Sequence, residues 1–208
     1  MKMIFTPIVM AVALLTSGCL SLTSYVDPAL GEVPAAERVA VADPQPVQFL
    51  FEFQTKGTAN ARATRQLHDQ AFEIVSNSGL FSEVSSEPVE SGALLSVTMN
   101  NIPQEDAAGR GFTTGLTLGL AGTTVSDFYV GTARFVSGPG ATEIAAEERH
   151  ALHSTLGNTD APQNLTPAAS PLEGVNTILR QLMEHLLFDV ARDPAFTPAP
   201  ADETAPEA

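Results

Sequence analysis

The stretch Val47-Gln48-Phe49-Leu50-Phe51-Glu52-Phe53-Gln54 decides the fold class of this chain. Its valine and three phenylalanines recur at every second position, and most of the residues between them are polar. Because side chains of an extended backbone alternate between two faces, this pattern predicts a half-buried β-strand with one apolar face. The rest of the chain must supply a second layer that covers this face.

A helix is predicted soon after this strand. Asn60 can cap its first turn, and Ser78-Gly79-Leu80 provides a glycine stop followed by a hydrophobic residue. Between these signals one apolar stripe recurs at helical spacing: Ala63, Leu67, Ala71, Ile74 and Val75. We therefore expect this helix to pack on the strand.

The clearest helical pattern lies near the C-terminus, from Pro171 to Arg192. Ser170 and Glu173 form a capping box around a proline at the first helical position, and Pro194 forces the end. The apolar residues recur at helical spacing over the whole segment. This helix can cover a second part of the same sheet.

Three further strands are predicted between the two helices, at residues 93–99, 128–136 and 143–154. The last two are joined by a glycine and proline turn and are interpreted as a hairpin. Charged residues alternate along 143–154, so this strand is expected at or near a sheet edge, where charges discourage edge pairing. The element order fits an α+β fold, a two-layer α/β sandwich with a mixed sheet of about four to five strands and both helices on one face.

The only cysteine of the chain, Cys19, follows a short apolar segment at the N-terminus. Lys2 supplies a positive charge ahead of the apolar residues 4–15, and the small residues Ser17 and Gly18 precede the cysteine. The apolar run is shorter than the roughly 20 residues that a membrane-spanning helix needs. The segment therefore has the pattern of a signal peptide.

This N-terminus resembles the lipobox of bacterial lipoproteins. The resemblance implies signal cleavage after Gly18 and acyl chains, palmitate among them, on Cys19. The chain departs from the usual pattern at Thr16, where the family generally has leucine. Because Leu20 rather than aspartate follows the cysteine, the resemblance implies the outer membrane, with the protein at its periplasmic face. An ordinary secretory signal is the alternative interpretation.

Composition divides the chain into four parts. We expect a signal peptide at 1–18, the lipidated cysteine with a proline-containing flexible tether at 19–45, a periplasmic α/β domain at 46–193 and a disordered acidic tail at 194–208. Without residues 1–18, nine basic residues remain against 24 acidic ones, a net charge of −15. Such a charge disfavours nucleic-acid binding, so the lipid must provide the membrane affinity.

An uncharged run from Gly111 to Val125 is the most unusual stretch. Three of its glycines lie four residues apart, as in closely packed helices, whereas its threonines favour extended backbone. It is interpreted either as an apolar connection folded over the domain's own core or as a surface that contacts lipid or another protein. The candidate contact residues are Phe112, Gly115, Leu116, Leu118, Gly119 and Leu120.

The sequence contains no recognisable catalytic motif, neither G-x-S-x-G nor HExxH nor a phosphate-binding loop. His150 and His153 are three apart on a predicted strand, so they point to opposite faces and are interpreted as partly exposed edge residues. We therefore expect a non-enzymatic protein with no cofactor and no metal. An enzyme assembled from scattered residues near Asp127, Glu147 or His150 is the alternative.

The element order of residues 46–193 is similar to that of small α/β periplasmic lipoproteins, which include the curli-secretion channel lipoprotein and lipoprotein activators of penicillin-binding proteins. The resemblance implies a lipid-anchored binding or accessory module for another envelope protein. The alternative is an oligomeric secretion or pore component that uses residues 111–125 for membrane contact. The channel lipoprotein has two membrane-inserting hairpins, whereas only one candidate stretch is visible here.

Overall fold

The computed structural model describes residues 22–104, 123–157, 159–160 and 163–196 of the 208-residue chain. Its elements, in chain order, are β1 (Leu22–Val26), the short 3-10 helix η1 (Ala35–Glu37), β2 (Val47–Thr55), β3 (Thr58–Ala59), α2 (Ala61–Ser76), β4 (Val84–Ser85), β5 (Leu94–Pro103), β6 (Thr123–Val136), β7 (Ile144–Leu156), β8 (Thr166–Ala168) and α4 (Pro171–Arg192).

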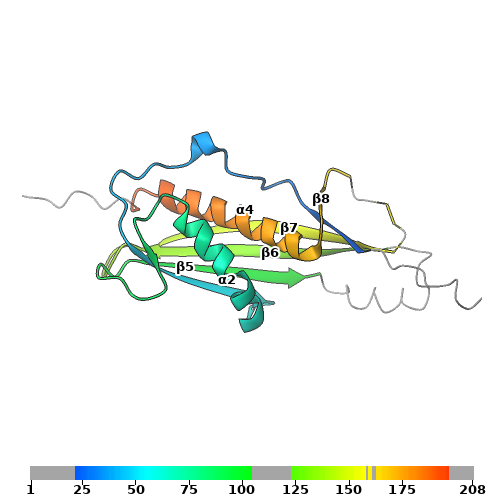
Figure 1. Ribbon diagram of the computed structural model, residues 1–208, viewed down its shortest axis with the longest axis horizontal. Helices are drawn as coiled ribbons and strands as arrows, with labels where there is room; N and C mark the ends of the chain where they lie inside the picture. The colour runs from blue at the N-terminus through cyan, green and yellow to red at the C-terminus, as the bar shows by residue number, and fades with distance from the viewer. Residues whose placement is uncertain (1–21, 105–122, 158, 161–162, 197–208) are drawn as a thin grey trace, which may run out of the picture.

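The strands of the described residues form one mixed sheet of eight strands in the order β3-β2-β5-β6-β7-β1-β8, with β4 paired to β2. β2 runs parallel to β4 and β5, and the other pairs are antiparallel. Both helices lie on one side of the sheet (Figure 1). The α+β prediction is confirmed, but four to five strands was too low, because strands of two to five residues are too short to show an alternating pattern.

The hydrophobic core lies between the sheet and the helices. Register aligns Phe49, Leu95, Phe135 and Ile144 across four neighbouring strands, and all four side chains are buried. On the helical side of the core, the buried residues of α4 include Ile178, Leu179, Leu182 and Leu186. Each such side chain contributes about 1.5–3 kcal/mol when it is fully buried, so this layer provides most of the stability.

Local caps set the first turns of both helices, as predicted. The Ala63 N–H donates to Asn60 Oδ1 at 3.1 Å, and the Glu173 N–H donates to Ser170 Oγ at 3.1 Å. These side chains satisfy backbone donors that have no partner inside a helix. The last turn of α4 ends at Arg192, directly before Asp193 and the proline.

The segment predicted as a flexible tether is part of the fold from Leu22 onward. β1 pairs with β7 and β8, and Val26 and Val33 are buried. Pairing with strands more than 120 residues away stabilises this segment, and the prolines lie in its connections. The edge position predicted for residues 143–154 is confirmed in part: β1 pairs with β7 only from Leu152 to Leu156, and residues 144–150 pair with β6 alone among the described residues.

The predicted tail also begins later than expected. Phe196 is buried, and its ring centroid lies 5.1 Å from that of Phe135 and 6.0 Å from that of Phe81. Three aromatic rings therefore close the end of the core next to the last turn of α4. The predicted signal peptide, Cys19 and residues 197–208 lie outside the described residues.

Candidate binding cleft

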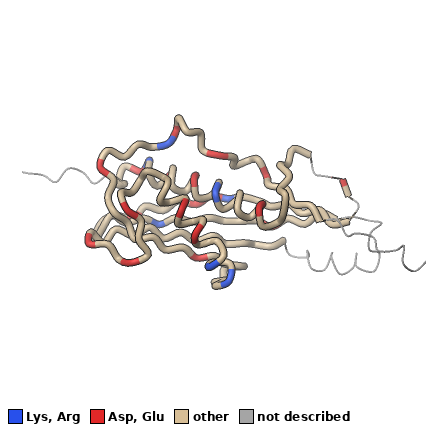
Figure 2. Tube along the Cα trace, viewed as in Figure 1, with Lys and Arg blue, Asp and Glu red and all other residues tan. Residues whose placement is uncertain are grey.

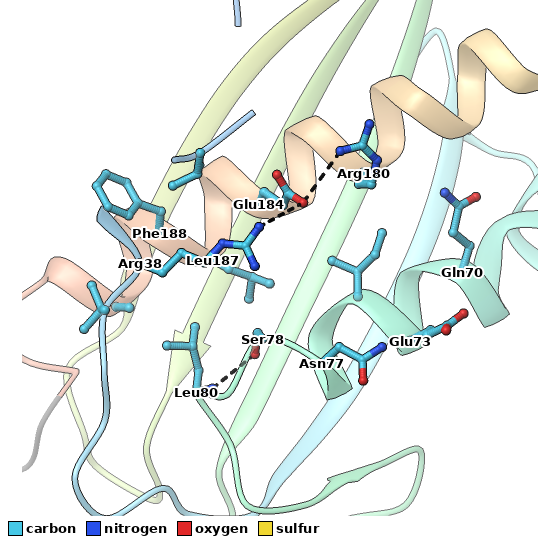
Figure 3. Close-up of a pocket in the computed structure, with 14 residues that line it drawn as sticks. Arg38, Gln70, Glu73, Asn77, Ser78, Leu80, Arg180, Glu184, Leu187 and Phe188 are labelled. Atoms are coloured by element: carbon cyan, nitrogen blue, oxygen red, sulfur yellow. Dashed lines mark hydrogen bonds and ion pairs between the residues drawn. The ribbon is translucent and has the colours of Figure 1, made fainter. Parts of the chain in front are cut away.

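A cleft of about 360 Å³ opens between the C-terminal halves of α2 and α4, beside the segment around η1. This volume falls within the range of about 300–1,000 Å³ that is typical of ligand sites. Figure 3 shows side chains from all three segments around it. The site therefore depends on residues 33–39, which the sequence assigned to a tether.

The apolar part of the cleft comes from the same three segments. Val33 and Val39 contribute from the N-terminal segment, Ile74 from α2, and Leu187 and Phe188 from α4. Arg192 lies over the Phe188 ring, with its guanidinium carbon 4.9 Å from the ring centroid, which holds the aromatic side chain in place. An apolar group that enters the cleft would leave water and contact these side chains.

The polar part of the cleft is centred on Glu184 of α4. Its Oε1 lies 3.7 Å from Arg38 Nη2 and 3.8 Å from Arg180 Nη1 (Figure 3). Arg180 Nη1 is also 2.6 Å from Glu32 Oε1, so the arginine is shared by two carboxylates. The Arg38 side chain is 55% exposed, and this ion pair adds little stability because water screens it.

The second carboxylate oxygen of Glu184 is unusual. Oε2 is buried and has no hydrogen-bond partner among the described residues. Leaving a buried acceptor unpaired costs about 1–3 kcal/mol, and more when it is charged. Because Oε2 is shielded from solvent in this rotamer, a bound donor reaches it only when the Glu184 side chain turns toward the cleft, and the hydrogen bond then recovers part of that cost.

The α2 side of the cleft is already hydrogen-bonded. Ser78 Oγ donates to the Val75 carbonyl at 2.6 Å and accepts from the Leu80 N–H at 3.2 Å. Gln70 Nε2 donates to the Asn176 carbonyl at 3.0 Å and joins α2 to α4. The serine hydroxyl is therefore engaged with the backbone, and it has no adjacent base in these contacts.

The residues named for a scattered enzyme are not brought together. None of Asp127, Glu147 and His150 lines the cleft. Glu147 forms an exposed ion pair with Arg149 at 3.0 Å. Burial raises the pKa of Asp127, and the Asn101 side chain partly offsets this by hydrogen bonding to the carboxylate. Each group thus has a local partner of its own.

His150 is buried, so the prediction that its side chain is partly exposed was wrong. Its Nε2 lies 2.6 Å from Gln181 Oε1, and its Nδ1 accepts from the Ala151 N–H at 2.9 Å. These partners fix a neutral imidazole that donates from Nε2. Burial lowers the pKa of His150, and the hydrogen bond to Gln181 opposes this effect. The residue links β7 to α4.

His153 lies on the opposite face of β7, as predicted. Its Nδ1 is 2.8 Å from Ser126 Oγ, and its Nε2 is 3.8 Å from Asp27 Oδ2. Sequence reasoning missed this group because its members come from separate parts of the chain. The Asp27 contact exceeds hydrogen-bond length, and Asp27 Oδ1 accepts from the Ala29 N–H instead. The arrangement joins β6, β7 and the end of β1, away from the cleft.

A pair of acidic side chains lies between β7 and α4. Burial raises the pKa of Glu148, and the charge of Asp189 raises it further, whereas His185 lowers it. His185 Nε2 is buried without a hydrogen-bond partner in the described part of the chain. Within residues 22–104, 123–157, 159–160 and 163–196, no group of three or more histidine, cysteine, aspartate or glutamate side chains has an arrangement that could hold a metal ion.

The predicted site residues lie outside the described residues: Gly18, Cys19, Phe112, Gly115, Leu116, Leu118, Gly119 and Leu120. The described chain stops at Gln104 and resumes at Thr123, and the Gln104 N–H donates to the Ser126 carbonyl at 3.1 Å. No helix of the described residues is both long enough and apolar enough to cross a membrane.

Sequence reasoning did not identify the cleft. Arg180 and Glu184 are four apart on α4 and have the pattern of an ordinary exposed ion pair. Arg38 lies in a segment without periodicity, so nothing local indicates that it reaches α4. The one hint that this segment packs on the domain is the presence of three apolar residues among its prolines and acids: Val33, Val39 and Val41.

No family model matches this chain, and no curated protein matches it. Among solved structures, a Xanthomonas campestris protein of family DUF330 is 11% identical with a TM-score of 0.40, over 77% of this chain and 89% of that one. A PelC dodecamer from Paraburkholderia phytofirmans is 10% identical with a TM-score of 0.36, over 83% and 97%. A putative neuraminyllactose-binding hemagglutinin homolog from Helicobacter pylori is 12% identical with a TM-score of 0.40, over 77% and 92%. Likenesses this weak carry no conclusion about function.

Proposed function

We propose that this chain is a lipid-anchored protein of the outer membrane, at its periplasmic face, and that its domain is a non-enzymatic binding or accessory module for another envelope protein. The lipobox pattern at Cys19 supports the anchor. The cleft between α2 and α4 supports the binding role, and its combination of apolar walls with the unpaired Glu184 Oε2 is the observation that carries the proposal.

The cleft suits an anchor residue of a partner protein. An apolar side chain that fills it would contribute about 1.5–3 kcal/mol by burial. Once the Glu184 side chain turns toward the cleft, a neighbouring backbone N–H, amide or basic group of the partner would donate to Oε2, and a hydrogen bond to a charged group adds about 1.5–3 kcal/mol. One such anchor, within a larger polar interface, is the usual composition of a protein-binding site.

The contacts in the cleft favour binding over catalysis. Its arginines, Arg38 and Arg180, are held in ion pairs, and Ser78 is bonded to the backbone. General acid or base catalysis needs a group whose proton can move at the working pH, next to a reacting atom. The cleft residues are arranged to recognise a donor and an apolar group.

Site-specific photo-crosslinking in cells tests the binding role. A photoreactive residue in place of Asn77, at the cleft, should give one discrete adduct with an envelope protein, whereas the same residue in place of Thr132, on the open side of the sheet, should not. The Glu184→Gln variant keeps the side-chain size and removes the charge, so it should reduce the yield of the Asn77 adduct. Equal adducts from both positions, or an adduct that E184Q leaves unchanged, would contradict the proposal.

The anchor has its own test. Metabolic labelling with a palmitate analogue should label the full-length chain, and Cys19→Ser should abolish the label and leave residues 1–18 uncleaved. A processed, unlabelled parent protein would instead support the ordinary secretory signal. This result would remove the lipid anchor and leave the cleft proposal intact.

An oligomeric secretion or pore component is the second candidate, favoured by the uncharged run Gly111–Val125, whose last three residues begin β6. The native mass of the lipidated protein in detergent distinguishes the two. A ring-sized assembly that is lost when residues 111–122 are deleted would favour the pore component. A monomer with or without those residues would favour the accessory module.

A further inference from the structure

The structure leaves very little chain between Cys19 and the folded domain. Leu22 begins β1 and is only three positions after the cysteine. Extended chain spans at most about 3.6 Å per residue, so these positions allow a separation of roughly 11 Å. If Cys19 carries the lipid, as proposed above, the start of β1 lies close to the membrane surface.

The register identifies the part of the sheet that lies at this end. Leu22 pairs with Leu156, and Leu156 pairs with Thr123, so β1, β6 and β7 reach the same end of the sheet. β6 then runs to Val136, and at about 3.3 Å per residue its two ends are about 43 Å apart. The cleft adjoins the C-terminal half of α4, whose first turn packs against Ala168 and Leu152 near β1.

This end of the sheet carries no fully charged side chain along its strands. The segments 22–26, 123–126, 151–156 and 166–168 contain no aspartate, glutamate, lysine or arginine, although the chain has 24 acidic and 10 basic residues. Figure 2 shows the charged residues gathered mainly over the helices and the opposite end. The nearest charged residues in sequence are Asp27 and Asp127, which directly follow two of these segments and are partly exposed, and the exposed Arg149, two positions before the third. An acidic end would be repelled by anionic head groups, whereas this one would not.

The side chains at this end suit a membrane interface. Leu22 is 51% exposed, Tyr25 and Thr123 are partly exposed, and Thr124 is exposed. Tyrosine and small hydroxyl residues can satisfy hydrogen bonds among head groups while an adjacent leucine contacts acyl chains. We define the membrane-facing tip as Leu22, Tyr25, Thr123, Thr124 and Leu156.

We propose that the membrane-facing tip rests on the lipid bilayer that holds Cys19, so that the sheet stands away from the membrane and presents the cleft to the periplasm. This inference rests on the proposed lipid anchor. The domain would then have a fixed orientation and would not hang on a long flexible tether. The short connection keeps the start of β1 near the anchor, and the strands at that end carry no charged side chains. A partner of the cleft would then be bound at a defined height above the head groups.

Three threonine-to-cysteine variants measure this orientation. Thr124 and Thr132 share one face of β6 and are eight residues apart, which places their Cα atoms about 26 Å from each other along the strand. Thr142 lies in the turn region at the far end of the sheet. The acyl chain on Cys19 occupies the only native thiol, so each new cysteine is the only free thiol. Full-length lipidated protein, labelled with an environment-sensitive fluorophore, is placed in phosphatidylethanolamine and phosphatidylglycerol vesicles that contain head-group spin-labelled lipid.

The expected result is strong quenching at T124C, weak quenching at T132C and none at T142C. Equal quenching at the three positions, or the reverse order, would overturn the orientation, as would the absence of quenching in protein that floats with the vesicles. Mass spectrometry of the N-terminus and flotation are measured on the same samples. Protein that lacks acyl chains and does not float would refute the anchor and the orientation together, whereas acylated, floating protein with a flat profile refutes the orientation alone.

Discussion

The two faces of the sheet are built from the same strands but have different environments. In β2, Phe49 is 1% exposed and faces the helices, whereas its neighbour Leu50 is 45% exposed on the open face. The same alternation continues in β5 and β6, where Ile102 and Phe128 pair across the open face and remain exposed. The covered face therefore provides the stability, and the open face can change with little thermodynamic cost.

The largest expected effect comes from truncating a leucine on the helix that covers the sheet. Leu182 of α4 is 1% exposed, so Leu182→Ala should leave a cavity and lower the free energy of unfolding by about 2–5 kcal/mol. Leu50→Ala removes the same atoms from the open face and should cost less than about 1 kcal/mol. Urea unfolding of the two variants measures the difference, and equal losses would show that the open face is covered in the native protein.

A smaller effect is expected at Gly174, where α4 packs against Leu152 of β7. A Cβ added at Gly174 would lie 2.6 Å from Leu152 Cδ1, which is too close for van der Waals contact. Gly174→Ala should therefore move the first turn of α4 and cost about 1–3 kcal/mol, although alanine favours helices over glycine by about 1 kcal/mol. Asn176→Ala, two residues along the same helix, serves as the control and should not destabilise. A G174A protein more stable than the parent would mean that Leu152 can move aside freely.

The sequence predicted the elements whose signals are local. The caps at Asn60 and Ser170 and the strict alternation of β2 depend on residues close together in the chain, so they could be identified without the fold. β1 and β8 are strands of five and three residues. β1 is stabilised by pairing with β7, and β8 by pairing with β1. Such distant pairing leaves no periodic pattern of its own.

The cleft could not be predicted for the same reason. Arg38 and Glu184 are 146 positions apart, and they meet only because the chain after β1 runs alongside α4 (Figure 1). The burial of His150 depends likewise on a distant element, since Gln181 of α4 covers the imidazole. The alternation of residues 143–154 correctly separated the two histidines, but it could not indicate which face the helix covers.

The smallest expected effect is a change in the pH dependence of stability through His150, on the covered face. In the unfolded chain this imidazole gains a proton near its ordinary pKa of about 6.5, whereas burial keeps its pKa lower in the folded protein. As the pH falls below about 6.5 the unfolded state binds the proton first, so stability decreases. The groups that face His150 are Gln181 and His185 of α4 and the carboxylate of Asp27 after β1. The charge of Asp27 raises the pKa of His150 and that of His185 lowers it, so burial, the largest effect, sets the direction of the pKa shift.

The His150→Gln variant isolates this contribution because its amide can still donate to Gln181 and does not titrate. Melting temperatures of the parent and the variant, measured from pH 8 to pH 5, should diverge toward lower pH, with the parent losing more stability. Glu148 and Asp127 act in the opposite direction, because their raised pKa values favour the folded protein as the pH falls. Their effect is common to both proteins and cancels in the difference between the two curves. Parallel curves would show that His150 takes its proton equally well in the folded and unfolded states, and the imidazole would then have access to water beneath α4.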